Sequence, residues 1–201
     1  MPSAFPTRRR LLRTFAAGAA ALVLAACGQS APQFKGSDIT GTRLGQGVAL
    51  TDFNGQPRTL KDFAGKVQVV FFGFTQCPDV CPTALAELAD VMQKLGPDAD
   101  RVQVMLITVD PERDTPAVLK QYVTTFDSRF LGLTGTAEQI KQAAASFKAY
   151  YAKVPRPDGD YTMDHTAAFY LMDTKGEARV LANNNLGADA LAHDIKALLQ
   201  G

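Results

Sequence analysis

The feature that most restricts the fold of this chain is a nearly continuous apolar run from Lys66 to Phe74. A run of β-branched and aromatic residues, with no alternation of polar and apolar positions, is typical of a strand that is buried on both faces. Residues 102–109 (VQVMLITV) form a second run of the same kind. Buried strands that alternate with helices predict an α/β fold, in which helices cover both faces of a largely parallel sheet.

Segments with helical periodicity separate and follow these two strands. A helix after the first strand is expected to end near Gly96. A second is expected to begin at Thr115, a favoured N-cap residue, with Pro116 in the first helical position. Residues 136–151 are predicted to form a third helix, and residues 155–160 a Pro/Gly-rich loop. The apolar face of the last predicted helix consists of Leu191, Ile195 and Leu198.

The sequence on either side of this region has the signals of hairpins. Residues 48–60, with Asn54 and Gly55 in the middle, predict an accessory β-hairpin before the first buried strand. Residues 167–172 and 178–181 predict two strands that are joined by a turn and add an antiparallel edge to the sheet. The chain is therefore expected to be one α/β domain with a central mixed sheet flanked by helices.

The first 26 residues have the pattern of a bacterial export signal. Three arginines at residues 8–10 precede an uncharged apolar stretch, residues 15–26, that is too short to span a hydrocarbon core of about 30 Å. The sequence LAAC, which ends at Cys27, resembles a lipobox and implies cleavage before Cys27 and lipidation of that residue. Secretory cleavage that leaves Cys27 unmodified is the alternative. Residues 7–13 (TRRRLLR) resemble a twin-arginine signal, and an ordinary basic leader is the alternative.

This leader divides the chain into a signal peptide (residues 1–26), a tether (residues 27–33) and one domain (residues 34–201). The domain is expected on the extracytoplasmic, periplasmic face of a bacterial membrane, where disulfides persist. Without the four leader arginines, 17 of the 21 Lys and Arg residues remain against 20 acids. A mildly acidic chain with no basic block lacks the charge pattern that a nucleic-acid-binding protein needs.

Cys77 and Cys81 follow the first buried strand in the sequence CPDVCP. The ends of such strands form the edge at which α/β folds bind ligands. Each cysteine precedes a proline, which favours an extended backbone, and Pro82 is predicted to be the first helical residue with Cys81 as the cap. The positive partial charge of the helix N-terminus raises the fraction of thiolate, which is both a nucleophile and a soft metal ligand.

The sequence has two histidines that are candidate partners of these sulfurs. His193 lies off the apolar face of the last predicted helix and is expected to be a solvated surface residue. His165 lies directly before a predicted strand, and its local sequence alone indicates a structural or surface residue. Two thiolates and one imidazole are too few ligands for structural zinc, whereas Cu(I) accepts low coordination and prefers sulfur.

Three segments together resemble the Sco/SenC family. They are the CPDVCP sequence after VVFFGFT, residues 109–116 (VDPERDTP), and the Asp164-His165-Thr166 sequence before a strand that ends at Asp173. The resemblance extends from residue 34 to the C-terminus. Members of this family are membrane-tethered, thioredoxin-like proteins that deliver copper to cytochrome c oxidase, mainly to its dinuclear CuA centre.

The resemblance implies a thioredoxin-like fold and a copper site whose ligands are Cys77, Cys81 and His165, which replaces the structural interpretation of His165. It also implies a metallochaperone rather than an enzyme, able to hold Cu(I) or Cu(II) only while the cysteines are reduced. The implied partners are the copper-bearing subunit of cytochrome c oxidase, a periplasmic copper donor, a thiol reductant, and a membrane reached through the lipid anchor.

An enzymatic alternative uses the same two cysteines. In it the chain is a thiol–disulfide oxidoreductase that reduces the copper-site cysteines of the oxidase before metal arrives, with Cys77 and Cys81 as the catalytic redox pair. His165 has no role in that reaction.

Three further residues are candidate auxiliary groups at this site. Asp79, between the cysteines, is interpreted either as a solvent-facing turn residue or as a group that tunes the thiols or contacts Cu(II). Asp110, after the second buried strand, is interpreted as structural, with a role near the metal or in partner docking as the alternative. Met163 is interpreted as a buried core residue, and a thioether contact to Cu(I) is the alternative if a strand begins before His165.

Overall fold

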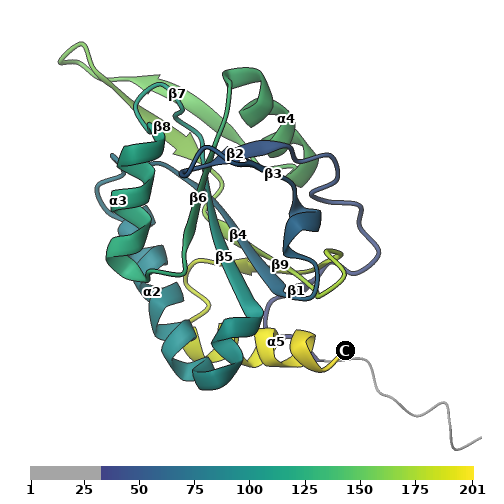
Figure 1. Cartoon of the computed structure of the whole chain (residues 1–201). Coiled ribbons are helices and arrows are strands. Elements are labelled where there is room, and N and C mark those ends of the chain that lie inside the picture. The colour runs from purple at the N-terminus through teal and green to yellow at the C-terminus, as the bar shows by residue number, and fades with distance from the viewer. Residues whose placement is uncertain (1–32) are drawn as a thin grey trace, which may run out of the picture. The chain divides into compact units, whose positions relative to one another are not determined.

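A computed structural model of the chain describes residues 33–201 (Figure 1). Residues 34–201 form one compact unit, which contains the whole of the described hydrophobic core. The predicted export signal, the lipidated Cys27 and all but the last residue of the predicted tether lie outside the described residues. In residues 33–201, no helix has the length and apolar character needed to cross a bilayer.

An eight-stranded mixed sheet forms the centre of this unit. Its two middle strands, β4 and β5, pair in parallel from Val67–Val102 to Gly73–Thr108, and every residue of β4 is buried. Both were predicted from their apolar runs. The strands lie in the order β1 (Ser37–Asp38), β10 (Ala178–Asn183), β9 (Ala168–Met172), β4 (Val67–Gly73), β5 (Val102–Thr108), β6 (Leu131–Thr134), β2 (Leu50–Asp52) and β3 (Pro57–Arg58).

The outer strands combine predicted and unpredicted elements. As predicted, β9 and β10 form an antiparallel pair, and β9 also pairs antiparallel with β4. The predicted accessory hairpin is present as β2 and β3, and β2 joins the sheet through β6. The parallel strand β6 was not predicted, because its four residues, one of them Gly132, are too few to show a pattern.

Helices cover both faces of the sheet. Successive residues of a strand point to opposite faces. Phe72 packs against Phe147 of α4, whereas the neighbouring Gly73 faces Cys81 of α2, so these two helices lie on opposite faces. Helices α2 and α5 pack on each other, and α3 packs on β6. The helices are α2 (Val80–Leu95), α3 (Pro116–Phe126), α4 (Ala137–Phe147) and α5 (Ala188–Gln200), with short 3₁₀ segments η2 (Leu60–Phe63) and η3 (Gly96–Arg101).

A second, two-stranded sheet lies outside the main sheet. The helix predicted over residues 136–151 ends at Phe147, because Lys148 adopts a left-handed backbone with φ of 55°. Strand β7 (Tyr151–Pro155) then pairs antiparallel with β8 (Tyr161–His165), and the predicted Pro/Gly loop is their turn. Sequence analysis missed this hairpin because its residues are mostly half-buried or exposed and form no apolar run.

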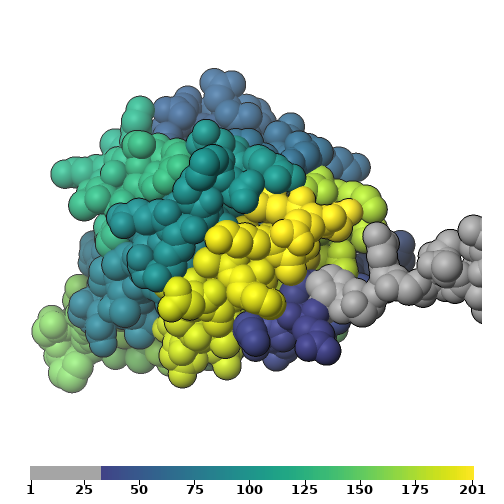
Figure 2. Space-filling model, turned by 90° about the horizontal axis from the view of Figure 1, so that it is seen from below, coloured from purple at the N-terminus to yellow at the C-terminus, as the bar shows by residue number. Residues whose placement is uncertain are grey.

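The first described residues lie beside the C-terminal helix (Figure 2). The carboxylate of Asp194 in α5 is buried and accepts hydrogen bonds of 2.8 Å from the backbone N–H groups of Lys35 and Gly36. His193 is half-exposed, as predicted for a surface residue, and its Nδ1 lies 2.9 Å from Asp194 Oδ1.

Candidate metal centre

The loop between β4 and α2 carries both candidate cysteines. Helix α2 begins at Val80, with Asp79 as its N-cap, so the prediction that Cys81 caps the helix and Pro82 begins it was wrong by two residues. Pro82 is accommodated as the third helical residue, because the N–H groups of the first turn have no partner within a helix and the missing N–H of proline costs nothing there. Cys81 is consequently buried in the first turn, while Cys77 is half-buried in the loop.

The Cys77 sulfur takes the position of a capping group for α2. The Asp79 side chain makes no capping hydrogen bond, whereas Cys77 Sγ accepts the backbone N–H of Cys81 at 3.4 Å. An anionic sulfur in this position is stabilised by the N–H groups and by the positive partial charge of the helix N-terminus. The local fold therefore favours a thiolate at Cys77.

The pKa values of the two thiols are shifted in opposite directions. Interaction with the Cys81 side chain lowers the pKa of Cys77 to about 5 against the opposing effect of burial, and the backbone N–H groups of Cys81 and Asp79 lower it further. Interaction with Cys77, together with burial, raises the pKa of Cys81 far above that of an ordinary thiol. At neutral pH the pair thus holds one proton, which resides on Cys81.

His165 completes the cluster from the other sheet. It is the last residue of β8, a strand that the sequence analysis did not predict. Its Nδ1 lies 3.1 Å from the carbonyl oxygen of Thr166, and because a carbonyl only accepts, Nδ1 carries the hydrogen. The Nε2 lone pair is then free to face Cys81 Sγ, 3.4 Å away. The rings of Phe71 and Phe74 pack edge-on against the imidazole.

The three side chains bring their donor atoms to one place. Cys77, Cys81 and His165 form the only group of three or more His, Cys, Asp or Glu in residues 33–201 whose ligand atoms converge, all within 4.8 Å of one another. Metal–sulfur and metal–nitrogen bonds of about 2.0–2.3 Å hold two donors of one ion at most about 4.6 Å apart. A small closure therefore fits an ion, and two sulfurs with one imidazole are a donor set that suits copper.

The three candidate auxiliary residues lie in different environments. Asp79 is exposed at the N-cap of α2, and Asp110 is buried with its carboxylate bonded to Arg113 and Tyr161. Neither aspartate belongs to the cluster of donor atoms. Met163 is buried in the core. Strand β8 begins at Tyr161, so Met163 and His165 share a face of that strand, as the ligand hypothesis requires.

Sequence analysis missed the part that Asp114 takes in the site. Thr115, and not Asp114, caps α3, through the backbone N–H of Val118 at 3.3 Å. Asp114 is buried, and its carboxylate accepts the backbone N–H of Thr75 at 3.1 Å and the hydroxyls of Thr75 and Thr108 at 2.6 Å each. Burial raises the pKa of Asp114 against these hydrogen bonds. Asp114 thus fixes the start of the cysteine loop to the end of β5.

Two more residues near the sulfurs were also missed. Gly73 ends β4, and a Cβ there would lie only 2.9 Å from Cys81 Sγ, so glycine permits the close approach. A glycine at the end of an apolar strand was the available signal. The buried hydroxyl of Tyr122 has no hydrogen-bond partner among the described residues. Burial, together with the nearby acidic groups of Cys81, Cys77 and Asp114, raises its pKa.

The fold and the site together define a thioredoxin-like α/β protein with a dithiol–imidazole centre. The chain belongs to the SCO1/SenC family, whose model matches residues 37–200. It is 46% identical over 137 residues to mouse "Protein SCO2 homolog, mitochondrial", an alignment that covers 66% of this chain and 54% of the relative. The chain thus matches about half the length of that relative. The predicted family and fold class are confirmed.

Solved structures of the family superimpose on the described domain. Bradyrhizobium japonicum ScoI with copper bound has a TM-score of 0.69 and 44% identity, and the match covers 80% of this chain and 97% of that one. BsSco, described as a member of the Sco family of cytochrome c oxidase assembly proteins with a disulfide switch, has a TM-score of 0.64 and 27% identity. That match covers 83% of this chain and 98% of BsSco.

Proposed function

We propose that this protein is a copper metallochaperone that binds the ion through Cys77, Cys81 and His165 and delivers it to cytochrome c oxidase during assembly. The observation that carries the proposal is the convergence of two sulfurs and one imidazole nitrogen within 4.8 Å. A relative with 44% identity has a solved structure with copper bound, and BsSco belongs to an oxidase assembly family, which supports copper as the cargo and the oxidase as the acceptor.

The geometry supports transfer of the ion rather than permanent storage. Three protein ligands leave a copper ion accessible, so thiolates of an acceptor can replace Cys77, Cys81 and His165 one at a time. The half-buried Cys77, with its lowered pKa, is the sulfur that an acceptor reaches first. We assign the dinuclear CuA centre of the copper-bearing oxidase subunit as the acceptor, and a periplasmic copper donor as the source.

Copper binding is gated by the oxidation state of the two thiols. Oxidation of Cys77 and Cys81 forms one S–S bond and releases the one proton that the reduced pair holds at neutral pH. The two electrons pass to a partner disulfide, whose S–S bond breaks to give two thiols, with the second proton taken from water. The oxidised pair no longer offers thiolate ligands, so copper loading requires a thiol reductant. Bound Cu(II) takes additional oxygen ligands, whereas Cu(I) is held by the three protein donors.

The proposed location follows from the leader. Cleavage before Cys27 and lipidation of that residue anchor residues 34–201 on the periplasmic side of a bacterial membrane, beside a membrane-bound oxidase. Metabolic labelling with a fatty-acid analogue tests the anchor, since Cys27→Ser removes the label if the proposal is correct.

Anaerobic titration of reduced residues 34–201 with Cu(I), against a chromophoric chelator, tests the metal site. The expected stoichiometry is one copper per chain, and His165→Ala should weaken binding by about tenfold or more. His193→Ala is the matched control, because it removes the other histidine and should leave binding unchanged. Equal Cu(I) affinity of the wild type and His165→Ala would show that His165 is not a copper ligand.

A thiol–disulfide oxidoreductase is the second candidate function. The pKa of Cys77 near 5 favours it, because this thiol is ionised at neutral pH next to a resolving partner, Cys81. In this function Cys77 attacks a disulfide of the oxidase subunit and Cys81 resolves the mixed disulfide. Oxidase assembly that survives His165→Ala but not Cys81→Ser would identify the reductase role, whereas loss in both variants supports copper delivery.

A further inference from the structure

The placement of His165 over the cysteines is not fixed by main-sheet pairing. Strands β7 and β8 pair only with each other, apart from the eight-stranded sheet. Apolar contacts of the imidazole with Phe71 and Phe74 hold the ring locally. These contacts hold only the His165 end of β8. The other end of the strand, at Tyr161, needs its own attachment to the rest of the protein, because a movement there would be passed along the strand to His165.

Arg113 supplies that attachment and at the same time contacts the cysteine loop. Its Nη2 donates to the carbonyl oxygen of Tyr161 at 2.8 Å, and its guanidinium carbon lies 3.3 Å from the centroid of the Tyr161 ring. Its Nη1 donates to Oε1 of Gln76, the residue before Cys77, at 2.7 Å. One largely buried side chain thus links the two segments that carry the metal ligands.

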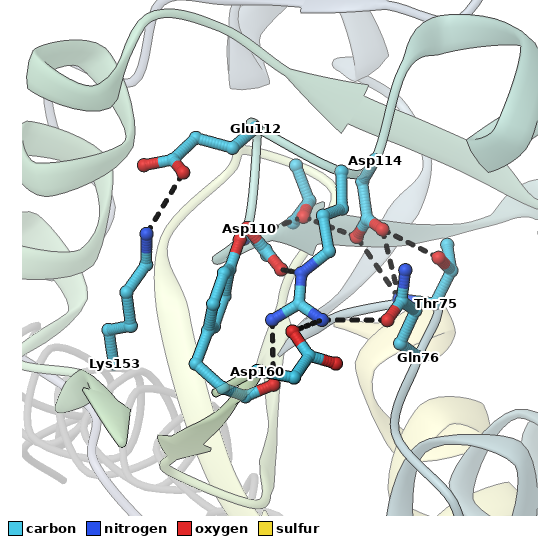
Figure 3. Close-up of polar contacts among 10 residues, drawn as sticks. Thr75, Gln76, Asp110, Glu112, Asp114, Lys153 and Asp160 are labelled. Atoms are coloured by element: carbon cyan, nitrogen blue, oxygen red, sulfur yellow. Dashed lines mark hydrogen bonds and ion pairs between the residues drawn. The ribbon is translucent and has the colours of Figure 1, made fainter. Parts of the chain in front are cut away.

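Asp110 holds Arg113 in place and is itself fixed to the end of β5. Figure 3 labels Asp110 and Gln76 within this network of polar contacts. Arg113 Nε donates to Asp110 Oδ2 at 2.8 Å, and Asp110 Oδ1 accepts the hydroxyl of Tyr161 at 3.0 Å. The backbone N–H of Asp110 donates to the hydroxyl of Thr108, at the end of β5. Asp110 is buried and both of its carboxylate oxygens are hydrogen-bonded. It therefore holds the guanidinium of Arg113 in a fixed position relative to the main sheet.

The strand transmits this attachment to the site. Tyr161 and His165 are the first and last residues of β8, and residues two and four apart in a strand lie on one face. At about 3.3 Å per residue, the four steps from Tyr161 to His165 span about 13 Å along the strand. A shift of the strand at Tyr161 therefore displaces the imidazole relative to Cys81 Sγ.

We propose that Arg113 is a positioning residue that sets the location of His165 relative to Cys77 and Cys81. This inference rests on the proposed copper site, since its effect on binding requires copper to be held there. A guanidinium is suited to the task because its planar fork serves several acceptors in fixed directions while its face covers an aromatic ring. Besides Gln76, Asp110 and Tyr161, the guanidinium of Arg113 also contacts Asp160 Oδ1 at 3.5 Å. Lysine at this position offers one ammonium group and cannot reach Gln76, Asp110 and Tyr161 together.

A double-mutant cycle with Cu(I) tests the proposal. Reduced residues 34–201 are compared as wild type, Arg113→Met, His165→Ala and the double variant, by competition with a chromophoric chelator. We expect Arg113→Met to weaken Cu(I) binding by about tenfold, and to have no further effect in the His165→Ala background, because both changes then remove the same contact. Arg113→Lys, which keeps the charge and the stem, should show a smaller loss.

Two controls separate positioning from general stability. Lys153→Met removes the other cation over the Tyr161 ring, with Nζ at 4.0 Å, but Lys153 pairs with Glu112 and does not contact the cysteine loop. Arg129→Met removes an arginine that pairs with Asp127. Both controls are expected to bind Cu(I) like the wild type. Thermal unfolding confirms that each variant is folded at the temperature of the titration.

A readout without copper keeps the inference separate from the proposed function. In metal-free protein, the imidazole nitrogen resonances of His165 should shift in Arg113→Met and remain unchanged in Lys153→Met. Wild-type Cu(I) affinity in Arg113→Met, or an equal loss with and without His165, would overturn the inference. Failure of the wild type itself to bind Cu(I), with the resonance shift still present, would overturn the proposed function and leave the positioning role supported.

Discussion

At the scale of single residues, the site depends on how closely β4 approaches the sulfur of Cys81. A Cβ at position 73 would lie 2.9 Å from Cys81 Sγ and 2.9 Å from Leu106 Cδ1, both of which belong to buried side chains. Gly73→Ala is therefore expected to displace the thiol and weaken Cu(I) binding. Overpacking should also lower the free energy of unfolding by about 1–3 kcal/mol. Chelator competition and urea unfolding measure the two effects.

Gly132→Ala is the matched control for this prediction. Its Cβ would lie 3.0 Å from Leu119 Cβ, so it also overpacks the core, but it meets neither cysteine. We expect a loss of stability with unchanged Cu(I) affinity. Equal changes of affinity in the Gly73 and Gly132 variants would show that the approach of Gly73 to Cys81 does not place the sulfur.

The residues of the site differ in how far their sequence reveals them. Cys77 and Cys81 could be predicted as a reactive pair because one short segment holds the strand end, both sulfurs and the helix start. His165 lies 84 residues from Cys81, and its local sequence indicated only a surface or structural residue. The assignment of His165 as a copper ligand depended on the family resemblance, because a local sequence pattern does not indicate which distant segments lie side by side in the fold. The same holds for Arg113, whose partners Gln76 and Tyr161 are 37 and 48 residues away.

At the scale of elements, a buried carboxylate joins the start of the described chain to the last helix. Asp194 is wholly buried and accepts the backbone N–H groups of Lys35 and Gly36. Asp194→Ala leaves these donors without that acceptor, so we expect the free energy of unfolding to fall by about 1–3 kcal/mol. Residues near Lys35 should also lose protection from proteolysis. Urea unfolding and limited trypsin digestion, which cleaves after Lys35, check the prediction.

Asp189→Ala is the control on the same helix. Its carboxylate is almost fully exposed and pairs with Lys94 at 2.9 Å, an arrangement that contributes little to stability. The variant should unfold and digest like the wild type. If Asp194→Ala also behaves like the wild type, the two hydrogen bonds do not hold the N-terminal segment on α5.

The elements that sequence analysis identified correctly are those with a complete pattern. Strands β4 and β5 are uninterrupted apolar runs, and α5 presents its three predicted apolar residues to the core. Strand β6 is too short for a pattern, and β7 and β8 are mostly half-buried and form no apolar run. The helix before β7 ends because Lys148 adopts a left-handed conformation. Lysine rarely takes this conformation, so the sequence carries no signal of the helix end.

At the scale of the whole molecule, the architecture produces two unlike thiols from two cysteines four residues apart. Cys77 lies outside α2, half-buried, where its sulfur accepts the backbone N–H of Cys81. Cys81 is inside the first turn, buried against Gly73 and His165. The sheet, the helix and the hairpin thereby assign the negative charge to the accessible sulfur and the proton to the buried one. This arrangement links the stability of the reduced protein to pH.

The sign of that link follows from the lowered pKa of Cys77. An unfolded thiol has a pKa of about 8.5, whereas Cys77 in the native protein has a pKa of about 5. Between these values the native state has lost a proton that the unfolded chain still holds, so the free energy of unfolding should rise with pH. The stabilisation should be complete above about pH 8.5 and should disappear as the pH falls through about 5.

Comparison with Cys77→Ser isolates this contribution, because serine keeps a small polar side chain that does not ionise in the same range. Urea unfolding of both proteins under a non-thiol reductant, at intervals from pH 5 to pH 8.5, measures the difference in the free energy of unfolding. We expect the free energy of unfolding of the wild type, relative to that of Cys77→Ser, to rise steadily from pH 5 to pH 8.5. A constant difference would mean that Cys77 is not a stabilised thiolate in the folded protein, and that the helix N-terminus does not set its charge.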